Sequence, residues 1–326
     1  MESTAIKPVN NGEIVHEAIP LSTGQPFMQA NTVESSLTEI RDKHIIPVFI
    51  KDNEPTISMA EFIDSTMETV GKVFAGKQVL NPSVRLSHPV KGRIPEAKKK
   101  PATELQEHEK TLYYERCAFI IELPNIRSRI DGNMLSLTIG GVKSYNLDNL
   151  YSRKGTDEHF KVFIGFQNKV CTNLCVSTDG YLENLAVKSV DHLQTAMKSL
   201  FETYDAKKHL TLLNRLNQHS LTEQQFATMI GRCRMYNHLP NDTKNEIAPL
   251  LFSDTQINAV VKDYYRDTSF CRGNDGSINL WKLYNLFTGS NKSSYIDTFL
   301  DRSVNAFQFS EQIRNGLENQ DNWFLN

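Results

Sequence analysis

The sequence changes character near Gly180, and this change constrains the fold more than any other feature. Between Asn81 and Gly180, runs of β-branched and aromatic residues are separated by turn residues, which is typical of strands. After Gly180, apolar residues recur at three- and four-residue spacing, which is typical of helices. The sequence therefore predicts an α+β protein. We expect an antiparallel β-sheet with a packed helix in the N-terminal half, followed by a helical C-terminal half.

The strongest strand signal is a hairpin over residues 161–177, with a tight two-residue turn at 167–168. An Asp-Gly-Asn sequence at 131–133 predicts another turn, and two glycines at 140–141 are expected to form a further one. The segment 88–101 contains three prolines and several charges, so it is predicted to be a loop and not a strand. Further strands are predicted at 45–50, 83–86, 111–123 and 135–139.

Ser58 begins the clearest helix in the sequence. Ser58 and Glu61 form a capping-box pattern, apolar residues follow at helical spacing, and Gly76 supplies a stop signal. One face of this helix must be buried, and we expect it to pack on the sheet. Further helices are predicted over 190–204, after a second capping box at 220–223, and over 278–287, where the pattern is amphipathic.

These patterns divide the chain into three parts. Residues 1–35 are polar and lack a sustained period, so we expect an extended or flexible arm. Residues 36–183 are predicted to form a sheet-rich α+β domain, and residues 184–326 a helical domain packed on the sheet.

The composition indicates a cytoplasmic protein without a disulfide framework. No apolar run approaches the roughly 20 residues that span a bilayer, and residues 1–10 lack the basic-then-apolar layout of a signal peptide. The chain has five cysteines, an odd number. Cys171 and Cys175 lie four apart in a predicted strand, hence about 13 Å apart, which is too far for one zinc ion. We expect packed thiols, no metal and no cofactor.

Motifs of known catalytic sites are absent from the sequence. We find no phosphate-binding glycine loop, no H-E-x-x-H and no G-x-S-x-G. Asp297 and Asp301 are one helical turn apart and are one candidate for a divalent ion site. The favoured alternative is that Lys292 and Arg302 pair with them on a solvated helix face. An enzyme is therefore the third choice, and no catalytic residue is assigned.

The positive charge of the chain is concentrated in its strand-rich middle. Residues 85–169 contain 15 Lys+Arg against 10 Asp+Glu. Such cations can follow a phosphate backbone, and neighbouring tyrosines can stack on unpaired bases. The alternative is that these lysines are solvated and the tyrosines line a sheet. The candidate nucleic-acid-binding residues are Arg85, Lys91, Arg93, Lys98, Lys99, Lys100, Tyr113, Tyr114, Arg127, Arg129, Arg153 and Lys154.

Several stretches together resemble an uncharacterised family from Bacteroides-type bacteria, catalogued as domain of unknown function 3871. The similarity runs from about Pro26 to the C-terminus. The stretches that carry it are Lys91–Ala97, Tyr113–Arg116, Leu137–Val142, Lys161–Phe166, Val170–Gly180, Leu221–Glu223, Asp254–Asn258, Leu283–Leu286 and Asn291–Arg302.

A weaker similarity links the chain to phage- and plasmid-encoded proteins of unknown function. They carry a valine-cysteine-x-asparagine motif and a tryptophan-x-leucine-tyrosine-asparagine helix. The matching residues are Val170, Cys171, Asn173, Trp281, Leu283, Tyr284 and Asn285. The resemblance implies a mobile-element or phage context and a cytosolic protein, and it implies no reaction.

Polar residues in these two motifs allow two interpretations. Asn173 lies in an apolar strand, and Asn285 and Thr288 lie in the Trp281 helix. A buried amide must be hydrogen-bonded. If the side chains point inward, they fix the hairpin to the helical half, and if outward, they line a groove. Structural fixing is the favoured interpretation.

Two functions from different classes follow. The first is a non-enzymatic protein of mobile-element maintenance that binds or anneals single-stranded nucleic acid, with single-stranded or duplex DNA as its partner. The alternative is a protein-interaction or anti-defence factor that binds a host protein through a protein interface. The first requires the basic residues to cluster on folding.

Overall fold

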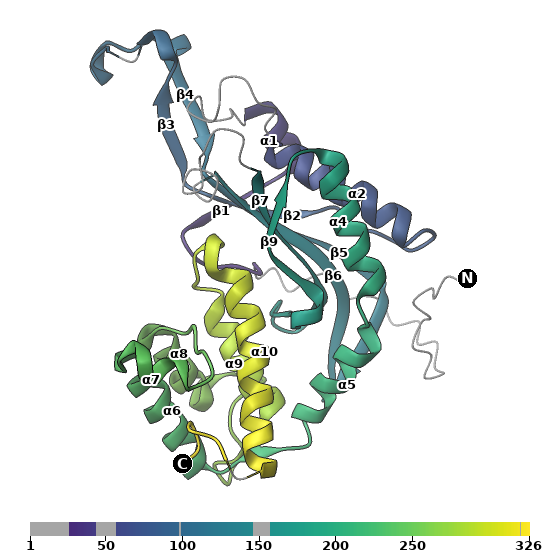
Figure 1. The fold of residues 1–326 in the computed structure, drawn as a ribbon, viewed down its shortest axis with the longest axis vertical. Coiled ribbons are helices and arrows are strands. Elements are labelled where there is room, and N and C mark those ends of the chain that lie inside the picture. Colours follow the sequence, from purple (N-terminus) through teal and green to yellow (C-terminus); the bar gives the residue numbers. More distant parts are fainter. Residues whose placement is uncertain (1–25, 44–56, 98, 146–156, 320) are drawn as a thin grey trace.

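The protein is built on one curled antiparallel sheet, as predicted for the N-terminal half (Figure 1). The computed structural model describes residues 26–43, 57–97, 99–145, 157–319 and 321–326. The predicted strand at 45–50 and most of the predicted arm 1–35 lie outside these residues. The sheet has seven strands in the order β1-β2-β5-β6-β7-β8, and β9 also pairs with β7. Its strands are β1 (Thr32–Ser35), β2 (Ser83–Ser87), β5 (Arg116–Ile130), β6 (Asn133–Ser144), β7 (Glu158–Asn168), β8 (Leu174–Cys175) and β9 (Tyr181–Val187).

Helices dominate the chain after β9, which confirms the predicted α+β class. Two further two-stranded sheets pair β3 with β4 and β10 with β11. Those strands are β3 (Pro89–Arg93), β4 (Lys110–Tyr114), β10 (Ser220–Leu221) and β11 (Ile278–Asn279). The helices are α1 (Leu37–Lys43), α2 (Met59–Val73), α4 (Val190–Thr203), α5 (Ala206–Leu216), α6 (Glu223–His238), α7 (Asn241–Asn245), α8 (Asp254–Arg266), α9 (Leu280–Asn291) and α10 (Ile296–Asn319).

Helices cover both faces of the sheet (Figure 1). On one face lie α2 and α4, and Phe62 of α2 packs edge-on against Phe119 and Phe160. On the other face lies α10, whose apolar residues share a core cluster with alternate residues of β5, β6 and β7. Because successive residues of a strand point to opposite faces, both sets of the sheet's residues can be apolar. The sheet is therefore enclosed between the two helical layers.

Local sequence signals placed several elements correctly. Ser58 caps α2, its hydroxyl accepts from the Glu61 N–H at 3.1 Å, and the Glu61 carboxylate accepts from the Ser58 N–H at 2.8 Å. The turn at 131–133 joins β5 to β6, with φ of 48° at Asp131 and 76° at Gly132. The Ser58 helix and this hairpin are confirmed.

The turn of the predicted 161–177 hairpin lies later than expected. β7 continues through Asn168, and its partner β8 begins only at Leu174. The side chain of Asn168 accepts from the Val170 N–H at 3.0 Å, and Thr172 adopts a φ of 59°. An asparagine that bonds its own backbone two residues on starts a turn, so the reversal follows Asn168 and does not include Gln167.

Two glycines predicted to form a turn lie inside a strand instead. Gly140 and Gly141 belong to β6, which runs to Ser144. A Cβ atom on Gly141 would lie 2.5 Å from the Phe62 ring, and one on Gly140 would lie 2.0 Å from the Phe119 carbonyl oxygen. Here glycine permits close approach and does not mark a reversal.

Two predicted helix starts in the C-terminal half need correction. Ser220 and Leu221 pair with β11, so α6 begins two residues later, with a capping box formed by Thr222 and Gln225. Likewise α9 begins at Leu280, and it is buried on nearly all sides instead of being amphipathic. The helix predicted over 190–204 is confirmed as α4.

Among the described histidines, only His209 of α5 is buried in the core. Its ring is 2% exposed, and it packs against the rings of Phe166 and Phe307. The Tyr204 hydroxyl lies 2.7 Å from its Nδ1. Burial lowers the pKa of His209 from 6.5 to about 3, because the imidazolium is poorly solvated there.

Lowering the pH from about 7.5 to 5 is expected to reduce the free energy of unfolding by about 2 kcal/mol through His209. The unfolded chain binds the proton below about pH 6.5, whereas the folded chain does not until about pH 3. Stability is therefore complete above pH 6.5 and is lost as the pH falls toward 3. Urea unfolding at both pH values measures the effect. The control is His209→Phe combined with Tyr204→Phe, whose pH dependence should be shallower by that amount. An equal dependence would contradict the prediction.

Candidate functional site at the root of the β3–β4 ribbon

A two-stranded ribbon, β3 paired with β4, projects from the body of the protein (Figure 1). The chain leaves the sheet at the end of β2 and returns at the start of β5. The loop predicted for 88–101 is therefore wrong over β3, and the strand predicted for 111–123 is divided into β4 and β5. Pro89 occupies the first position of β3, where proline is tolerated. Pro95 and Pro101 fall after the strand, in or next to 3₁₀ turns.

The ribbon brings part of the predicted basic set together. The backbone places Lys91 and Arg93 in β3, and Tyr113 and Tyr114 in β4. Lys99 and Lys100 are exposed in the segment that joins the two strands, where Lys100 pairs with Glu109. Lys98, Arg153 and Lys154 lie outside the described residues.

The other predicted cations lie elsewhere. Arg85 in β2 is largely buried, and its Nε donates to Thr32 Oγ1 at 3.0 Å. Arg127 and Arg129 are exposed near the far end of β5, beyond a register shift. Arg127 is eleven residues further along β5 than Arg116, which corresponds to about 36 Å along the strand. The structure therefore divides the predicted set into a ribbon group and a distant pair.

The register of the ribbon pairs two basic residues along the backbone. Arg93 is directly opposite Lys110, and Lys91 lies two positions before Arg93. Alternate positions of a strand share a face, so these three positions belong to one face of the ribbon. Like charges directly opposite each other destabilise a strand pair by up to about 1 kcal/mol. Lys110 also pairs with Glu107, an exposed residue, which offsets part of that repulsion.

A polar pocket lies at the root of the ribbon, and we call it the root pocket. Its volume is about 190 Å³. It is lined by residues in or next to β1, the end of β2, the start of β5 and the start of α10. They include Asn31, Ser87, His88, Glu115, Arg116 and Tyr295. Tyr295 is 67% exposed at this site. The root pocket thus combines an exposed aromatic ring with both hydrogen-bond donors and acceptors.

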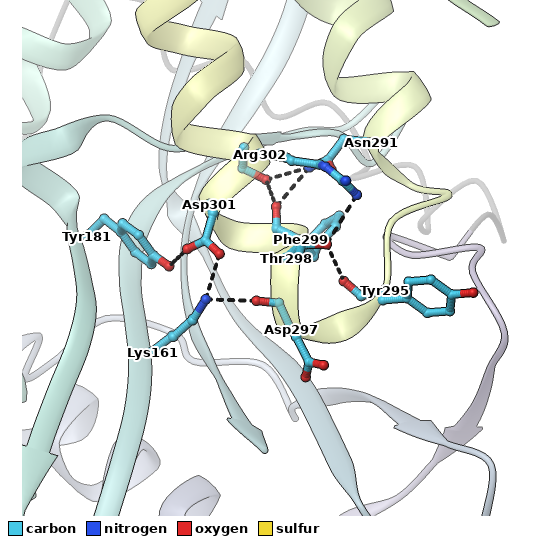
Figure 2. Close-up of polar contacts among 10 residues, drawn as sticks. Lys161, Tyr181, Asn291, Tyr295, Asp297, Thr298, Phe299, Asp301 and Arg302 are labelled. Carbon is cyan, nitrogen blue, oxygen red and sulfur yellow. Dashed lines mark hydrogen bonds and ion pairs between the residues drawn. The ribbon is translucent and has the colours of Figure 1, made fainter. Parts of the chain in front are cut away.

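Ion pairs and hydrogen bonds fix α10 on the sheet beside the root pocket, and Figure 2 shows the part around Lys161, Tyr181 and Asp301. Lys161 Nζ of β7 donates to Asp301 Oδ2 at 2.6 Å and to the Asp297 carbonyl oxygen at 2.8 Å. The Tyr181 hydroxyl donates to Asp301 Oδ1 at 2.5 Å. Burial raises the pKa of Tyr181, so its hydroxyl stays protonated and remains a donor. Arg116 Nε lies 2.7 Å from Asp297 Oδ2.

The two aspartates therefore have different partners from those predicted. Arg116 and Lys161 of the sheet pair with them, in a partly buried interface. Arg302 instead donates to Thr298 Oγ1 at 3.1 Å and to the Leu251 carbonyl oxygen at 2.8 Å. The predicted partner Lys292 donates to the loop that contains Cys171 and Thr172. Within the described ranges, no three His, Cys, Asp or Glu residues are grouped so that they could hold a metal ion.

The backbone that carries Tyr295 is held by the same helix start. The Thr298 N–H donates to the Tyr295 carbonyl oxygen at 3.1 Å, and the Thr298 hydroxyl lies 3.3 Å from it. Arg302 in turn holds that hydroxyl (Figure 2). The ring is thus exposed on a restrained backbone. Sequence reasoning did not single out Tyr295, Glu115, Arg116 or Tyr181, because no local pattern connects these separate segments.

The polar residues of the two sequence motifs meet in the interior. Asn173 Nδ2 donates to the Asn285 carbonyl oxygen at 2.9 Å, and Asn168 Nδ2 donates to Asn285 Oδ1 at 3.1 Å. The Thr288 hydroxyl bonds the Tyr284 carbonyl oxygen within α9. Asn173, Asn285 and Thr288 are all buried. Asn173 and Asn285 tie the β7–β8 turn to α9, whereas Thr288 bonds only within α9.

The two thiols of the hairpin are packed in the same region. Cys175 is buried, and Cys171 is half-buried. Burial raises the pKa of Cys171 to about 11, which leaves its thiol protonated at neutral pH.

The fold and the site define an α+β protein with an enclosed curled sheet and a projecting ribbon that carries cations. The chain belongs to the family described as Domain of unknown function, B. Theta Gene description (DUF3871), whose model matches residues 9–325. The predicted family is thereby confirmed. No curated protein and no solved structure matches the chain. The similarity to phage and plasmid proteins stays a prediction. None of the helices in the described ranges is long and apolar enough to cross a bilayer.

Proposed function

We propose that the protein binds single-stranded nucleic acid through the β3–β4 ribbon, in a cytoplasmic role connected with a mobile element. The observation that carries the proposal is the projecting ribbon, in which the strand positions of Lys91, Arg93 and Lys110 belong to one face by the backbone register. Two cations placed directly opposite each other weaken a free ribbon, whereas an anion bound between them would stabilise it. A phosphate backbone supplies such anions at regular intervals.

The net charge of the ribbon is small, so we expect only a few phosphate contacts and a moderate dependence of affinity on salt. Residues 88–116 contain seven Lys+Arg and five Asp+Glu. Each phosphate contact on a single strand contributes about 0.7 to the slope of log affinity against log salt. Four contacts would give a slope of about −3, so raising the salt fourfold should lower affinity by roughly fiftyfold.

Reversing both opposed charges, Arg93→Glu with Lys110→Glu, is expected to lower affinity for an oligonucleotide of about 15 nucleotides at least tenfold. The slope against salt should become shallower by about 1.4, because two phosphate contacts are lost. Fluorescence anisotropy between about 50 and 200 mM salt measures both quantities. The matched control is Arg127→Glu with Arg129→Glu, which makes the same charge change at the far end of β5.

The single variant Arg93→Glu separates binding from folding. It places a carboxylate opposite Lys110, so the ribbon gains an attractive cross-strand pair while it loses a phosphate contact. Reduced binding with an unchanged melting temperature supports the proposal. Equal losses in the ribbon variant and in the Arg127/Arg129 control would overturn it, as would binding that does not depend on salt.

A protein-interaction or anti-defence role is the second candidate, and one observation favours it. Among the described strands, β3 and β4 pair only with each other, so their outer edges offer unpaired backbone groups. A partner protein can add a strand to such an edge. A host protein that is captured by the wild-type chain but not by a variant with a proline in place of Leu112, whose backbone N–H faces the outer edge of β4, in the absence of oligonucleotide binding, would favour this candidate.

A further inference from the structure

We infer that the root pocket binds an unpaired guanine base, with Tyr295 as the stacking platform. The inference rests on the proposed function, since it takes the bound strand as the source of the base. The pocket lies where the ribbon joins the sheet, so a strand that follows the ribbon would reach it directly.

Tyr295 has the properties of a stacking residue. Its ring is exposed, whereas its backbone is held by Thr298 (Figure 2). A restrained backbone removes part of the conformational entropy that would be lost when a base stacks on the ring, and stacking tolerates any base because each has a π-face. Stacking therefore explains affinity for an unpaired base, but not a preference among bases.

The ion pair between Glu115 and Arg116, in the same pocket, explains the preference for guanine. Arg116 Nη1 lies 3.4 Å from Glu115 Oε2, and Asp297 holds Nε of the same guanidinium at 2.7 Å. Both side chains are about one-quarter exposed, so both can be reached by a ligand. The pocket therefore presents a fork of donors next to a carboxylate acceptor.

Guanine matches this arrangement better than the other bases. Its O6 and N7 atoms accept a bidentate bond from arginine, and its N1–H and N2–H groups donate to an acceptor such as a carboxylate. Adenine offers an N6 donor where guanine offers the O6 acceptor, so it would oppose the guanidinium. Asp297 acts as a positioning residue, because it orients Arg116 without reaching the base.

The test compares oligothymidylate strands that carry one central guanosine, inosine or adenosine. We expect the guanosine strand to bind about tenfold more tightly than the adenosine strand, with inosine, which lacks the N2 amino group, in between. Tyr295→Ala should lower affinity for the guanosine strand about tenfold without changing the slope against salt, and Tyr295→Phe should retain it. Glu115→Gln should lower the ratio of guanosine to adenosine affinity, because the acceptor for N1–H and N2–H is weakened, while Arg116 retains the remaining preference. Tyr265→Ala, which removes another exposed tyrosine on α8, is the matched control.

Binding of free GMP and AMP, followed by the NMR signals of the protein, separates this inference from the proposed function. A GMP preference that disappears in Tyr295→Ala, in a chain that binds no oligonucleotide, supports the pocket and overturns the ribbon proposal. Strand binding with equal affinity for the guanosine and adenosine strands overturns the guanine inference alone. Failure to bind either strands or nucleotides overturns both.

Discussion

Replacing Gly140 by alanine is expected to lower the free energy of unfolding by about 4 kcal/mol or more. The added Cβ would lie 2.0 Å from the carbonyl oxygen of Phe119 in β5 and 2.9 Å from the Phe163 ring. A backbone oxygen of a neighbouring strand cannot move away as a side chain can. β5 and β6 must therefore separate locally, which breaks hydrogen bonds at the centre of the sheet. Urea or thermal unfolding measures the loss.

Gly71→Ala provides the matched control. Gly71 is exposed in α2, and a Cβ added there meets nothing within 4 Å. Alanine in a helix is more favourable than glycine by roughly 0.5–1 kcal/mol, so this variant should be more stable than the wild type. If Gly140→Ala were as stable as the wild type, that result would contradict the close approach of β5 to β6 at Gly140.

Lys161→Met is expected to destabilise the protein by about 3 kcal/mol. The Lys161 and Asp301 side chains are 11% and 19% exposed, and their atoms are 2.6 Å apart. Removing the ammonium leaves the Asp301 carboxylate partly buried, with Tyr181 as its remaining described donor. An uncompensated charge of this kind costs more than the ion pair itself contributes. Chemical denaturation of the purified variant gives the value.

Two further variants isolate the cause of that loss. Lys161→Met combined with Asp301→Leu and Tyr181→Phe removes all three polar side chains of the cluster, so most of the stability should return. Lys208→Met breaks an ion pair of the same length with Asp179, but both side chains are more than half exposed. Its effect should stay below about 1 kcal/mol. A triple variant no more stable than Lys161→Met would show that packing, and not charge, explains the loss.

Signals that depend on neighbouring residues were predictable from the sequence. The Ser58–Glu61 capping box and the 131–133 turn are each complete within four residues, and both form as predicted. Proline and glycine were ambiguous, because each has more than one structural use. Pro89 starts a strand, and Gly140 admits a neighbouring backbone, although both residue types also mark loops and turns.

The site depends on contacts between distant segments, and these explain the errors there. Lys161 and Asp301 are 140 residues apart in the chain, so no spacing rule could pair them. Lys292 and Arg302 were expected to pair with the aspartates because they are near in sequence, but both bond other backbone segments. Similarly, the basic residues form one continuous group in the sequence, whereas β5 carries Arg127 to the opposite end of the sheet from the ribbon.

The ribbon is an insertion between two neighbouring strands. β2 and β5 are hydrogen-bonded partners, with Leu86 opposite Cys117, and the Arg116 N–H bonds the Ser87 hydroxyl where the two strands diverge. A short turn at that point would join the same two strands as a simple hairpin, with the strand order of the sheet unchanged. The seven-stranded sheet therefore does not depend on the β3–β4 ribbon. A change in the length of the ribbon should leave the packing of the core unaltered, so the ribbon and the core can be changed independently.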